Sequence, residues 1–297
     1  MKIKGIITPI VTPMLKNEEV NYEEFKRQIN RLINNGVHGI FIFGTNGEGY
    51  ILTNEEKVKL MEVAVKEVND RVPVYAMTGL TGTKETIRLT KKAEEIGVDA
   101  VSIVTPYFAA ASQKEIYHHY KSIAENVNIP IILYNIPARS GNYISSQTVY
   151  ELSKIPNIVG VKDSSGNFDN ILQYIEITKN NKNFHVISGN DSLILWTLLA
   201  GGVGGIAGCS NVYPQTLANI YEYFINGEIV KAKECQDSIR SFRNCFKYGN
   251  PNTVVKQTVN LLGYDVGNCR APFNYLPTEG IRAIKDVLKE NNKKKMK

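Results

Sequence analysis

One lysine of the sequence has the setting that an amine nucleophile needs. Lys162 ends the apolar run of residues 158–162, so we predict a buried strand whose last side chain is an amine. Lysine is rarely buried without a partner or a function. Loss of water favours its neutral form, which can attack a carbonyl carbon and form an imine. An ion pair with the neighbouring Asp163 is the structural alternative, and the sequence leaves both open.

Two further side chains could take part in the same chemistry. Tyr134 ends another apolar run, and its hydroxyl could carry protons to and from an adduct on a lysine. A buried tyrosine with a satisfied hydrogen bond is the more ordinary explanation. Arg139 follows in the next loop, where its planar guanidinium could bind a carboxylate, although most loop arginines are simply solvated.

A glycine-rich loop at residues 44–49 could hold an anion. Three glycines alternate there with Thr45, Asn46 and Glu48. Glycines let main-chain N–H groups approach an anion closely, and Thr45 adds a hydroxyl donor. A tight turn into a following helix is the alternative.

The elements that must position these residues are short apolar runs. They show no alternation of apolar and polar residues, which is typical of parallel strands buried on both faces. The runs cover residues 6–11, 39–43, 74–77, 100–104, 131–134, 158–162, 185–188 and 204–207.

Segments with helical periodicity lie between the runs. Asn21 with Glu24, and Thr53 with Glu56, have the spacing of a capping box at a helix start. Glycines at 36 and 97 stand where a helix should end before the next strand.

This alternation predicts an α/β fold, a (β/α)8 barrel, at residues 1–225, followed by a C-terminal helical extension packed on it at residues 226–297. An open doubly wound sheet is the alternative, but the GxGxxG sequence expected after its first strand is missing. Reactive residues of such barrels lie at the carboxyl ends of the strands, where Lys162, Tyr134 and the 44–49 loop all fall.

Seven ordered motifs extend over nearly the whole chain. They are Gly5-Ile6-Ile7-Thr8-Pro9 with Val11-Thr12-Pro13, Gly44-Thr45-x-Gly47-Glu48, Thr105-Pro106-Tyr107, Tyr134-Asn135-Ile136-Pro137, Gly160-Val161-Lys162, Ser188-Gly189-Asn190-Asp191 and Gly201-Gly202-x-Gly204-Gly205-Ile206. Together they resemble the dihydrodipicolinate synthase and N-acetylneuraminate lyase family of pyruvate-dependent aldolases.

The resemblance implies a chemical role for several residues. Lys162 would form an imine with the ketone of pyruvate, so no other cofactor and no metal is expected. Tyr134 would relay protons, and Thr45 would join it in a hydroxyl network. The main-chain N–H groups of Thr45 and Asn46 would hold the pyruvate carboxylate.

The resemblance also implies substrate-binding positions and an assembly. Gly189, Ile206 and Tyr107 lie in motifs that would contact the substrates, which are pyruvate and an aldehyde. Family members are commonly tetramers built as paired dimers, so a homotetramer is expected, with Tyr107 and Phe108 at the tighter interface.

The position of this chain within the family depends on a few residues that disagree. Arg139 favours the synthases, in which it binds the carboxylate of aspartate semialdehyde. Phe108 replaces the relay tyrosine of synthases and lyases, and Asn46 and Ser164 resemble the hydroxyoxoglutarate and sugar-acid aldolases. The synthase reaction is our leading hypothesis, and those aldolases, N-acetylneuraminate lyase and a barrel that only binds are the alternatives.

Composition excludes several other classes. The formal charge is +6, but four lysines lie in residues 293–297, a tail that we expect to be solvated, so no nucleic-acid partner is expected. No apolar run of about 20 residues predicts a membrane segment. No leader precedes residues 2–7, and the four cysteines form no CxxC pair, so we expect a reduced cytoplasmic protein without a metal site.

Overall fold

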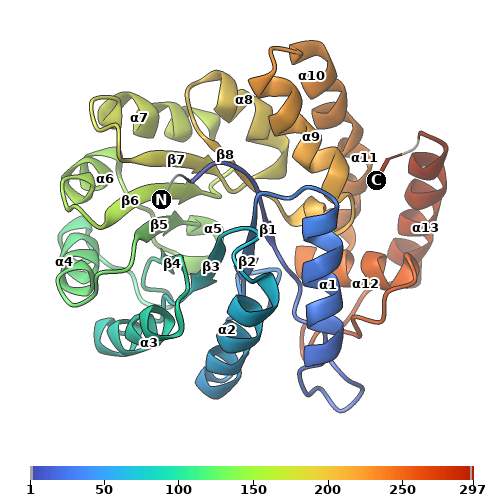
Figure 1. Cartoon of the computed structure of the whole chain (residues 1–297), viewed down its shortest axis with the longest axis horizontal. Helices are drawn as coiled ribbons and strands as arrows, with labels where there is room; N and C mark the ends of the chain where they lie inside the picture. The colour runs from blue at the N-terminus through green and yellow to red at the C-terminus, as the bar shows by residue number, and fades with distance from the viewer. Residues whose placement is uncertain (1–2, 295) are drawn as a thin grey trace. The chain divides into compact units, whose positions relative to one another are not determined.

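A computed structural model describes residues 3–294, 296 and 297 of the chain (Figure 1). Eight strands form a closed barrel in the order β1 to β8, and the strand pairs are parallel. This confirms the predicted (β/α)8 fold, and each strand begins and ends within two residues of its predicted run. The chain divides into two compact units, one containing Pro73–Ile206 and the other containing Gly5–Val72 and Ala207–Lys297.

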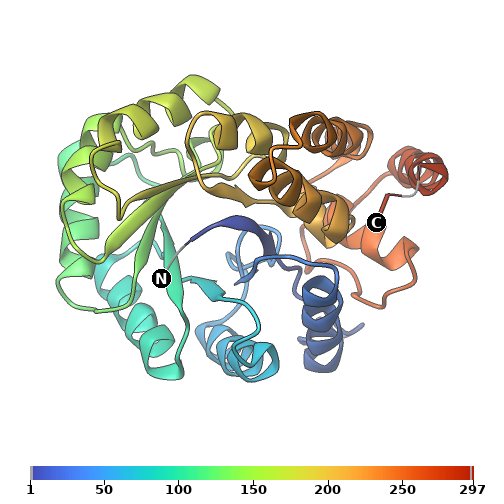
Figure 2. The ribbon, with the colours of Figure 1, turned by 45° about the horizontal axis from the view of Figure 1, so that its top comes forward.

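The unit at Pro73–Ile206 contains six strands and the helices that connect them. Its helices α3, α4, α6 and α7 follow one another along the outside of the strands in Figures 1 and 2. The strands are β3 (Val74–Met77), β4 (Ala100–Val104), β5 (Ile131–Asn135), β6 (Ile158–Asp163), β7 (His185–Ser188) and β8 (Gly204–Ile206). The helices are α3 (Thr83–Ile96), α4 (Gln113–Ala124), α5 (Pro137–Ser140), α6 (Ser146–Ser153), α7 (Phe168–Thr178), η1 (Asp191–Leu193) and α8 (Ile194–Leu199).

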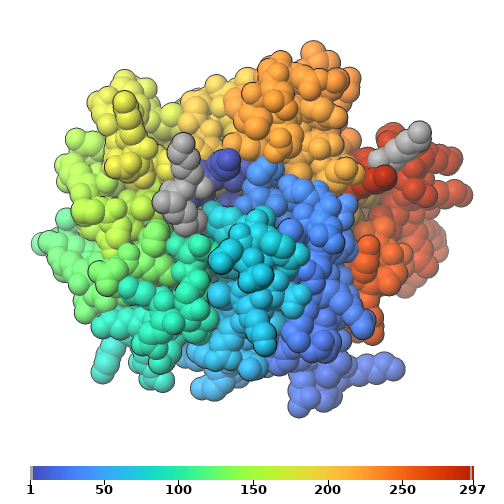
Figure 3. All heavy atoms as spheres, in the orientation of Figure 1, coloured from blue at the N-terminus to red at the C-terminus, as the bar shows by residue number. Residues whose placement is uncertain are grey.

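The other unit pairs β1 (Gly5–Pro9) with β2 (Gly39–Ile42) and carries the C-terminal helices. Figure 3 shows α1 and α2 side by side on one of its faces, where Asn30 donates to Glu67 over 2.6 Å. Its helices are α1 (Tyr22–Asn34), α2 (Asn54–Val68), η2 (Gly208–Asn211), α9 (Pro214–Ile225), α10 (Ile229–Ser238), α11 (Arg240–Arg243), η3 (Asn244–Tyr248), α12 (Pro251–Leu261) and α13 (Thr278–Lys293). The predicted C-terminal helices are thus present, and their division from the barrel at residue 225 stays a prediction.

The helix ends follow the predicted signals with one exception. Thr53 and Glu56 form the complete capping box of α2. Asn21 caps α1 through Glu24 N–H, but the predicted reciprocal bond is wrong, because the Glu24 carboxylate accepts from Gln28 over 2.7 Å instead. Gly97 ends α3 in the left-handed conformation that glycine adopts without strain.

The last residues of the chain correct another prediction. Met296 N–H donates to Asn291 O over 3.1 Å, and Lys297 O accepts from the N–H of Thr216 over 2.7 Å. Thr216 lies in the first turn of α9, where N–H groups have no partner within the helix. Lys297 is exposed, as expected of a solvated tail, whereas Met296 is half-buried, so the prediction is corrected at residue 296 alone, and Lys295 lies outside the described residues. None of the helices in the described ranges is long and apolar enough to cross a membrane.

Candidate active site

Lys162 and Tyr134 lie next to each other on neighbouring strands. They are paired in the register of β5 and β6, so their side chains project to the same face of the sheet. Lys162 Nζ lies 3.8 Å from the centroid of the Tyr134 ring. Both side chains are buried, at 4% and 2% exposure. The structure thus brings together the two residues that the sequence predicted to act as nucleophile and proton carrier.

This arrangement suits amine chemistry. The electron-rich face of an aromatic ring attracts an ammonium group, which allows a lysine to stay charged in a site with little water. An amine of this kind attacks a carbonyl carbon once a neighbouring base has removed one of its protons. A phenol beside the amine is a group that can donate and accept a proton. The pair can therefore form and hydrolyse an imine.

Asp163 belongs to a different network from Lys162. Successive side chains of a strand point to opposite faces, and Asp163 is fully buried on the other face of β6. Its Oδ2 accepts from Asn135 over 2.7 Å and from Asn170 over 2.6 Å, and its Oδ1 accepts from the hydroxyl of Ser165 over 2.6 Å. Neutral donors satisfy both oxygens, so the alternative of a Lys162–Asp163 ion pair is wrong.

This network fixes the carboxyl ends of β5 and β6. Asn135 donates to Asp163 and accepts from Ile144 N–H over 3.0 Å, which ties β5 to both β6 and the loop that leads to α6. Asp163 was considered only as an ion-pair partner of Lys162, and Asn135 was not singled out within its motif. The available signal was their position, each directly after a residue predicted to carry the chemistry.

Gly189 lies against the stem of Lys162. A Cβ atom at position 189 would lie 2.9 Å from Lys162 Cε and 2.0 Å from Ser164 Oγ. Gly189 N–H also donates to Asp163 O over 2.6 Å, so the main chain holds this close approach. Gly189 was predicted to bind substrate, and the structure places it where it limits the position of the lysine.

The other predicted residues of this unit occupy separate positions. Arg139 is exposed on the short helix α5, and among the described residues it makes no ion pair. Ile206 is buried at the end of β8, and Tyr107 is half-buried after β4. Arg139 is thus accessible to an anionic ligand.

Phe108 has an unusual conformation. Its side chain is fully exposed, and its φ of 79° lies in a region that residues other than glycine rarely adopt. Asn142 holds the loop from both sides, since its amide donates to Pro106 O and Ala109 O over 2.8 Å each. An ordered loop therefore presents a large apolar side chain to the surroundings. Asn142 was not predicted, because it lies in none of the motifs found in the sequence.

The 44–49 loop belongs to the other unit and forms a tight turn. Glu48 N–H donates to Thr45 O, and Gly49 N–H donates to Gly44 O, over 3.2 Å each. Two residues next to or within the turn, Phe43 with φ 38° and Glu48 with φ 59°, have positive φ, which costs about 1–3 kcal/mol each. Strain of this kind is concentrated at functional sites.

Thr45 and Asn46 are the accessible part of this loop. They are half-buried, whereas Phe43, Gly47 and Glu48 are buried. Asn46 packs closely on Gly208, because a Cβ there would lie 2.8 Å from its amide nitrogen. The two residues predicted to hold a carboxylate are thus the ones that the turn presents.

A cleft of about 770 Å³ in the same unit contains none of the predicted residues. It lies between the segment after β1 and the segment between α12 and α13, and it is lined by residues that include Met14, Glu18, Tyr264 and Asn268. In the described part of the chain, no group of three or more histidine, cysteine or acidic residues could hold a metal ion.

Comparison with known proteins identifies the family of the chain. A model of the dihydrodipicolinate synthetase family matches residues 2–291. A 4-hydroxy-tetrahydrodipicolinate synthase of Oceanobacillus iheyensis is 38% identical over 297 residues, which is 100% of both chains.

Two solved structures extend this likeness to the fold. The dihydrodipicolinate synthase of Bacillus anthracis is 37% identical, with a TM-score of 0.93 over 97% of this chain and 98% of that one. The chloride-inhibited dihydrodipicolinate synthase of Acinetobacter baumannii, complexed with pyruvate, is 33% identical, with a TM-score of 0.94 over 98% of this chain and 99% of that one. These relatives confirm the resemblance predicted from the motifs, and their names are those of the synthase branch. The chain belongs to the dihydrodipicolinate synthetase family of pyruvate-dependent lyases.

Proposed function

We propose that this enzyme catalyses the 4-hydroxy-tetrahydrodipicolinate synthase reaction, in which pyruvate condenses with aspartate semialdehyde. The observation that carries the proposal is the buried Lys162 amine 3.8 Å from the Tyr134 ring. The name of the relative from Oceanobacillus iheyensis, at 38% identity, supports the choice of reaction.

The proposed reaction begins at the carbonyl carbon of pyruvate. The neutral Lys162 amine attacks this carbon, and loss of water gives a protonated imine, with protons carried by the Tyr134 hydroxyl. The imine accepts electrons when C3 loses a proton, which gives an enamine. The enamine carbon then bonds to the aldehyde carbon of the second substrate. The amino group of the aspartate semialdehyde part then attacks the imine carbon and displaces the Lys162 amine, which closes the ring of the product and restores the enzyme.

The carboxylate of pyruvate needs donors of its own. We assign this role to the main-chain N–H groups of Thr45 and Asn46, with the Thr45 hydroxyl in the proton network. Their half-buried position in the tight turn supports the assignment. We also assign substrate contacts to Ile206 and Tyr107.

Turnover measurements test the reaction directly. Pyruvate with borohydride should leave a reduced adduct on Lys162. In the absence of borohydride, the enzyme should consume pyruvate and aspartate semialdehyde in equal amounts. The matched panel consists of 2-oxo-3-deoxy sugar acids and 4-hydroxy-2-oxoglutarate, the substrates of the second candidate function. Phe108 favours that candidate, since a phenylalanine has no hydroxyl to relay a proton. Turnover of a panel member without turnover of the semialdehyde would replace the leading proposal.

Arg139 is expected to select the second substrate. Replacement of Arg139 by methionine should raise the KM for aspartate semialdehyde about 10- to 100-fold, because a hydrogen bond to a charged group contributes about 1.5–3 kcal/mol. The KM for pyruvate should stay within about twofold. Steady-state kinetics with each substrate varied in turn provide the measurement. Equal increases in the KM values for both substrates would show that Arg139 does not select the second substrate.

Gly189 is expected to set the position of Lys162. Replacement of Gly189 by alanine should slow imine formation about 100-fold, because its Cβ would press on Lys162 Cε and a displacement near 1 Å has about this cost. Borohydride trapping over time measures the rate. Gly82→Ala is the control, since a Cβ at position 82 meets nothing within 4 Å. A normal trapping rate in Gly189→Ala would show that the lysine stem has room to move.

We further propose a homotetramer built as a dimer of dimers that works in the cytoplasm without a metal or an added cofactor. The exposed Phe108, held on an ordered loop, supports its placement at a subunit interface. The four free cysteines support a reducing compartment.

A further inference from the structure

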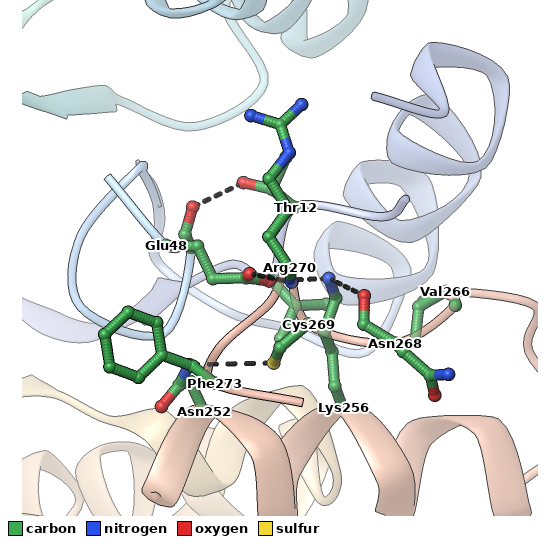
Figure 4. Close-up of polar contacts among 12 residues, drawn as sticks. Thr12, Glu48, Asn252, Lys256, Val266, Asn268, Cys269, Arg270 and Phe273 are labelled. Carbon is green, nitrogen blue, oxygen red and sulfur yellow. Dashed lines mark hydrogen bonds and ion pairs between the residues drawn. The ribbon is translucent and has the colours of Figure 1, made fainter. Parts of the chain in front are cut away.

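A buried ion pair joins the 44–49 loop to the C-terminal helices. Glu48 Oε1 accepts from Lys256 Nζ over 2.6 Å, and the two side chains are 0% and 1% exposed. Lys256 lies on α12, and 208 residues separate it from Glu48 in the sequence. Figure 4 shows this contact at the centre of a cluster of polar side chains.

The Glu48–Lys256 pair also makes hydrogen bonds to main-chain groups. Glu48 Oε2 accepts from the main-chain N–H of Arg270 over 2.8 Å, and Lys256 Nζ donates a second bond to Asn268 O over 2.9 Å (Figure 4). The Arg270 guanidinium in turn binds the carboxylate of Glu56 on α2, which lowers the pKa of that carboxyl. The segment that receives Glu48 is therefore itself held in place.

A second bond fixes the loop from the opposite side. The buried Thr12 hydroxyl donates to Gly47 O over 2.7 Å. A Cβ at position 47 would lie 2.8 Å from Ile10 O, so the loop also packs tightly on the main chain after β1. Gly47 and Glu48 are thus anchored directly after Thr45 and Asn46, the two residues that the turn leaves accessible.

The conformation of Glu48 shows why an anchor is needed. Its φ of 59° is disfavoured for any residue with a Cβ, and it lies directly before Gly49, whose N–H donates to Gly44 O across the turn. A glycine would adopt it without strain. Burying two charges adds little stability in general, because desolvation offsets their attraction. A buried pair on a strained residue is therefore better explained by the geometry that it imposes.

We propose that Lys256 and Glu48 are positioning residues for pyruvate binding. The ion pair, through the strained Glu48, holds the main-chain N–H groups of Thr45 and Asn46 in the orientation that binds the carboxylate. The proposal rests on the proposed function, which assigns the pyruvate carboxylate to these two groups. It gives the C-terminal helices a part in substrate binding, although they contribute no group that touches the substrate.

Lys256→Met tests this role with the full-length enzyme. The change leaves the Glu48 carboxylate buried without its cationic partner, with the N–H of Arg270 and the Cys269 thiol beside it, so we expect the side chain to move and the turn with it. We expect the KM for pyruvate, and the pyruvate concentration that gives half-maximal borohydride trapping, to rise about tenfold or more. The KM for the aldehyde should stay within about twofold. Val259→Ala, at a buried apolar position on α12, is the matched control for lost stability and should leave both KM values unchanged.

Thr12→Val provides a second test if Lys256→Met fails to fold. The two side chains are similar in size, and the change removes the hydroxyl that donates to Gly47 O. The same selective rise in the KM for pyruvate is expected, though smaller. Unchanged half-maximal trapping in folded Lys256→Met or Thr12→Val would overturn the positioning role. Absence of trapping in the wild-type enzyme would instead overturn the proposed function, so the two failures are distinguishable.

Discussion

Replacement of Lys162 by methionine is expected to reduce turnover by about 1000-fold or more, because removal of a covalent nucleophile removes the whole imine route. Pyruvate and borohydride should then add no mass to the protein. Intact-mass measurement after trapping checks the adduct, and a coupled assay checks the rate. Lys154→Met is the control, since Lys154 is a solvent-exposed lysine paired with Glu151, and both trapping and turnover should persist.

The same replacement has an expected effect on stability. A polar group is costly to bury, and methionine fills a similar volume without one, so Lys162→Met should melt at the same temperature as the wild type or higher. Thermal unfolding of both proteins provides the measurement. A large fall in melting temperature with turnover retained would show that the lysine is a structural residue.

Tyr134→Phe is expected to reduce the rate about 100- to 10,000-fold, the range that a general acid or base contributes. The ring that lies 3.8 Å from Lys162 Nζ remains, whereas the hydroxyl proposed to transfer the proton is lost. Stopped-flow measurement of imine formation and steady-state turnover should both show the loss. Because the packing is kept, the melting temperature should change little.

Tyr213→Phe is the matched control for Tyr134. Tyr213 is also buried, at 4% exposure, and its hydroxyl accepts from the Asn291 side-chain amide over 2.9 Å. Its removal should lower the free energy of unfolding by about 1 kcal/mol and leave the kinetics unchanged. If both variants lost activity in proportion to their stability, the hydroxyl of Tyr134 would have no role in proton transfer.

The parts of the structure predicted from the sequence are those encoded locally. A strand buried on both faces needs a continuous apolar run, and each such run appears directly in the chain. The positions of Lys162 and Tyr134 followed from the same runs, since each residue lies at the carboxyl end of a strand. Parallel pairing of β5 with β6 then places them side by side.

The parts that the sequence did not reveal depend on partners far away in the chain. Nothing near Glu48 indicates that Lys256 neutralises it, and the cost of burying either charge depends on the presence of the other. The prediction that Glu24 completes a capping box is wrong for a similar reason, because Gln28 competes for the carboxylate that the capping box would use. Asp163 follows Lys162 directly in the sequence, but successive side chains of β6 point to opposite faces, so Asp163 bonds to Asn135 instead.

The separation of 208 residues between Glu48 and Lys256 also bears on synthesis of the protein. A ribosome adds about 5–20 residues each second, so the lysine follows its glutamate by roughly 10–40 s. The strand ends that carry Tyr134 and Lys162 can meet earlier, since the bond from Asn135 to Asp163 spans 28 residues. A nascent chain can therefore bring Tyr134 and Lys162 together while the turn at residues 44–49 is still unanchored. A chain that ends before α12 would lack this anchor permanently, so premature termination should yield protein that binds pyruvate poorly.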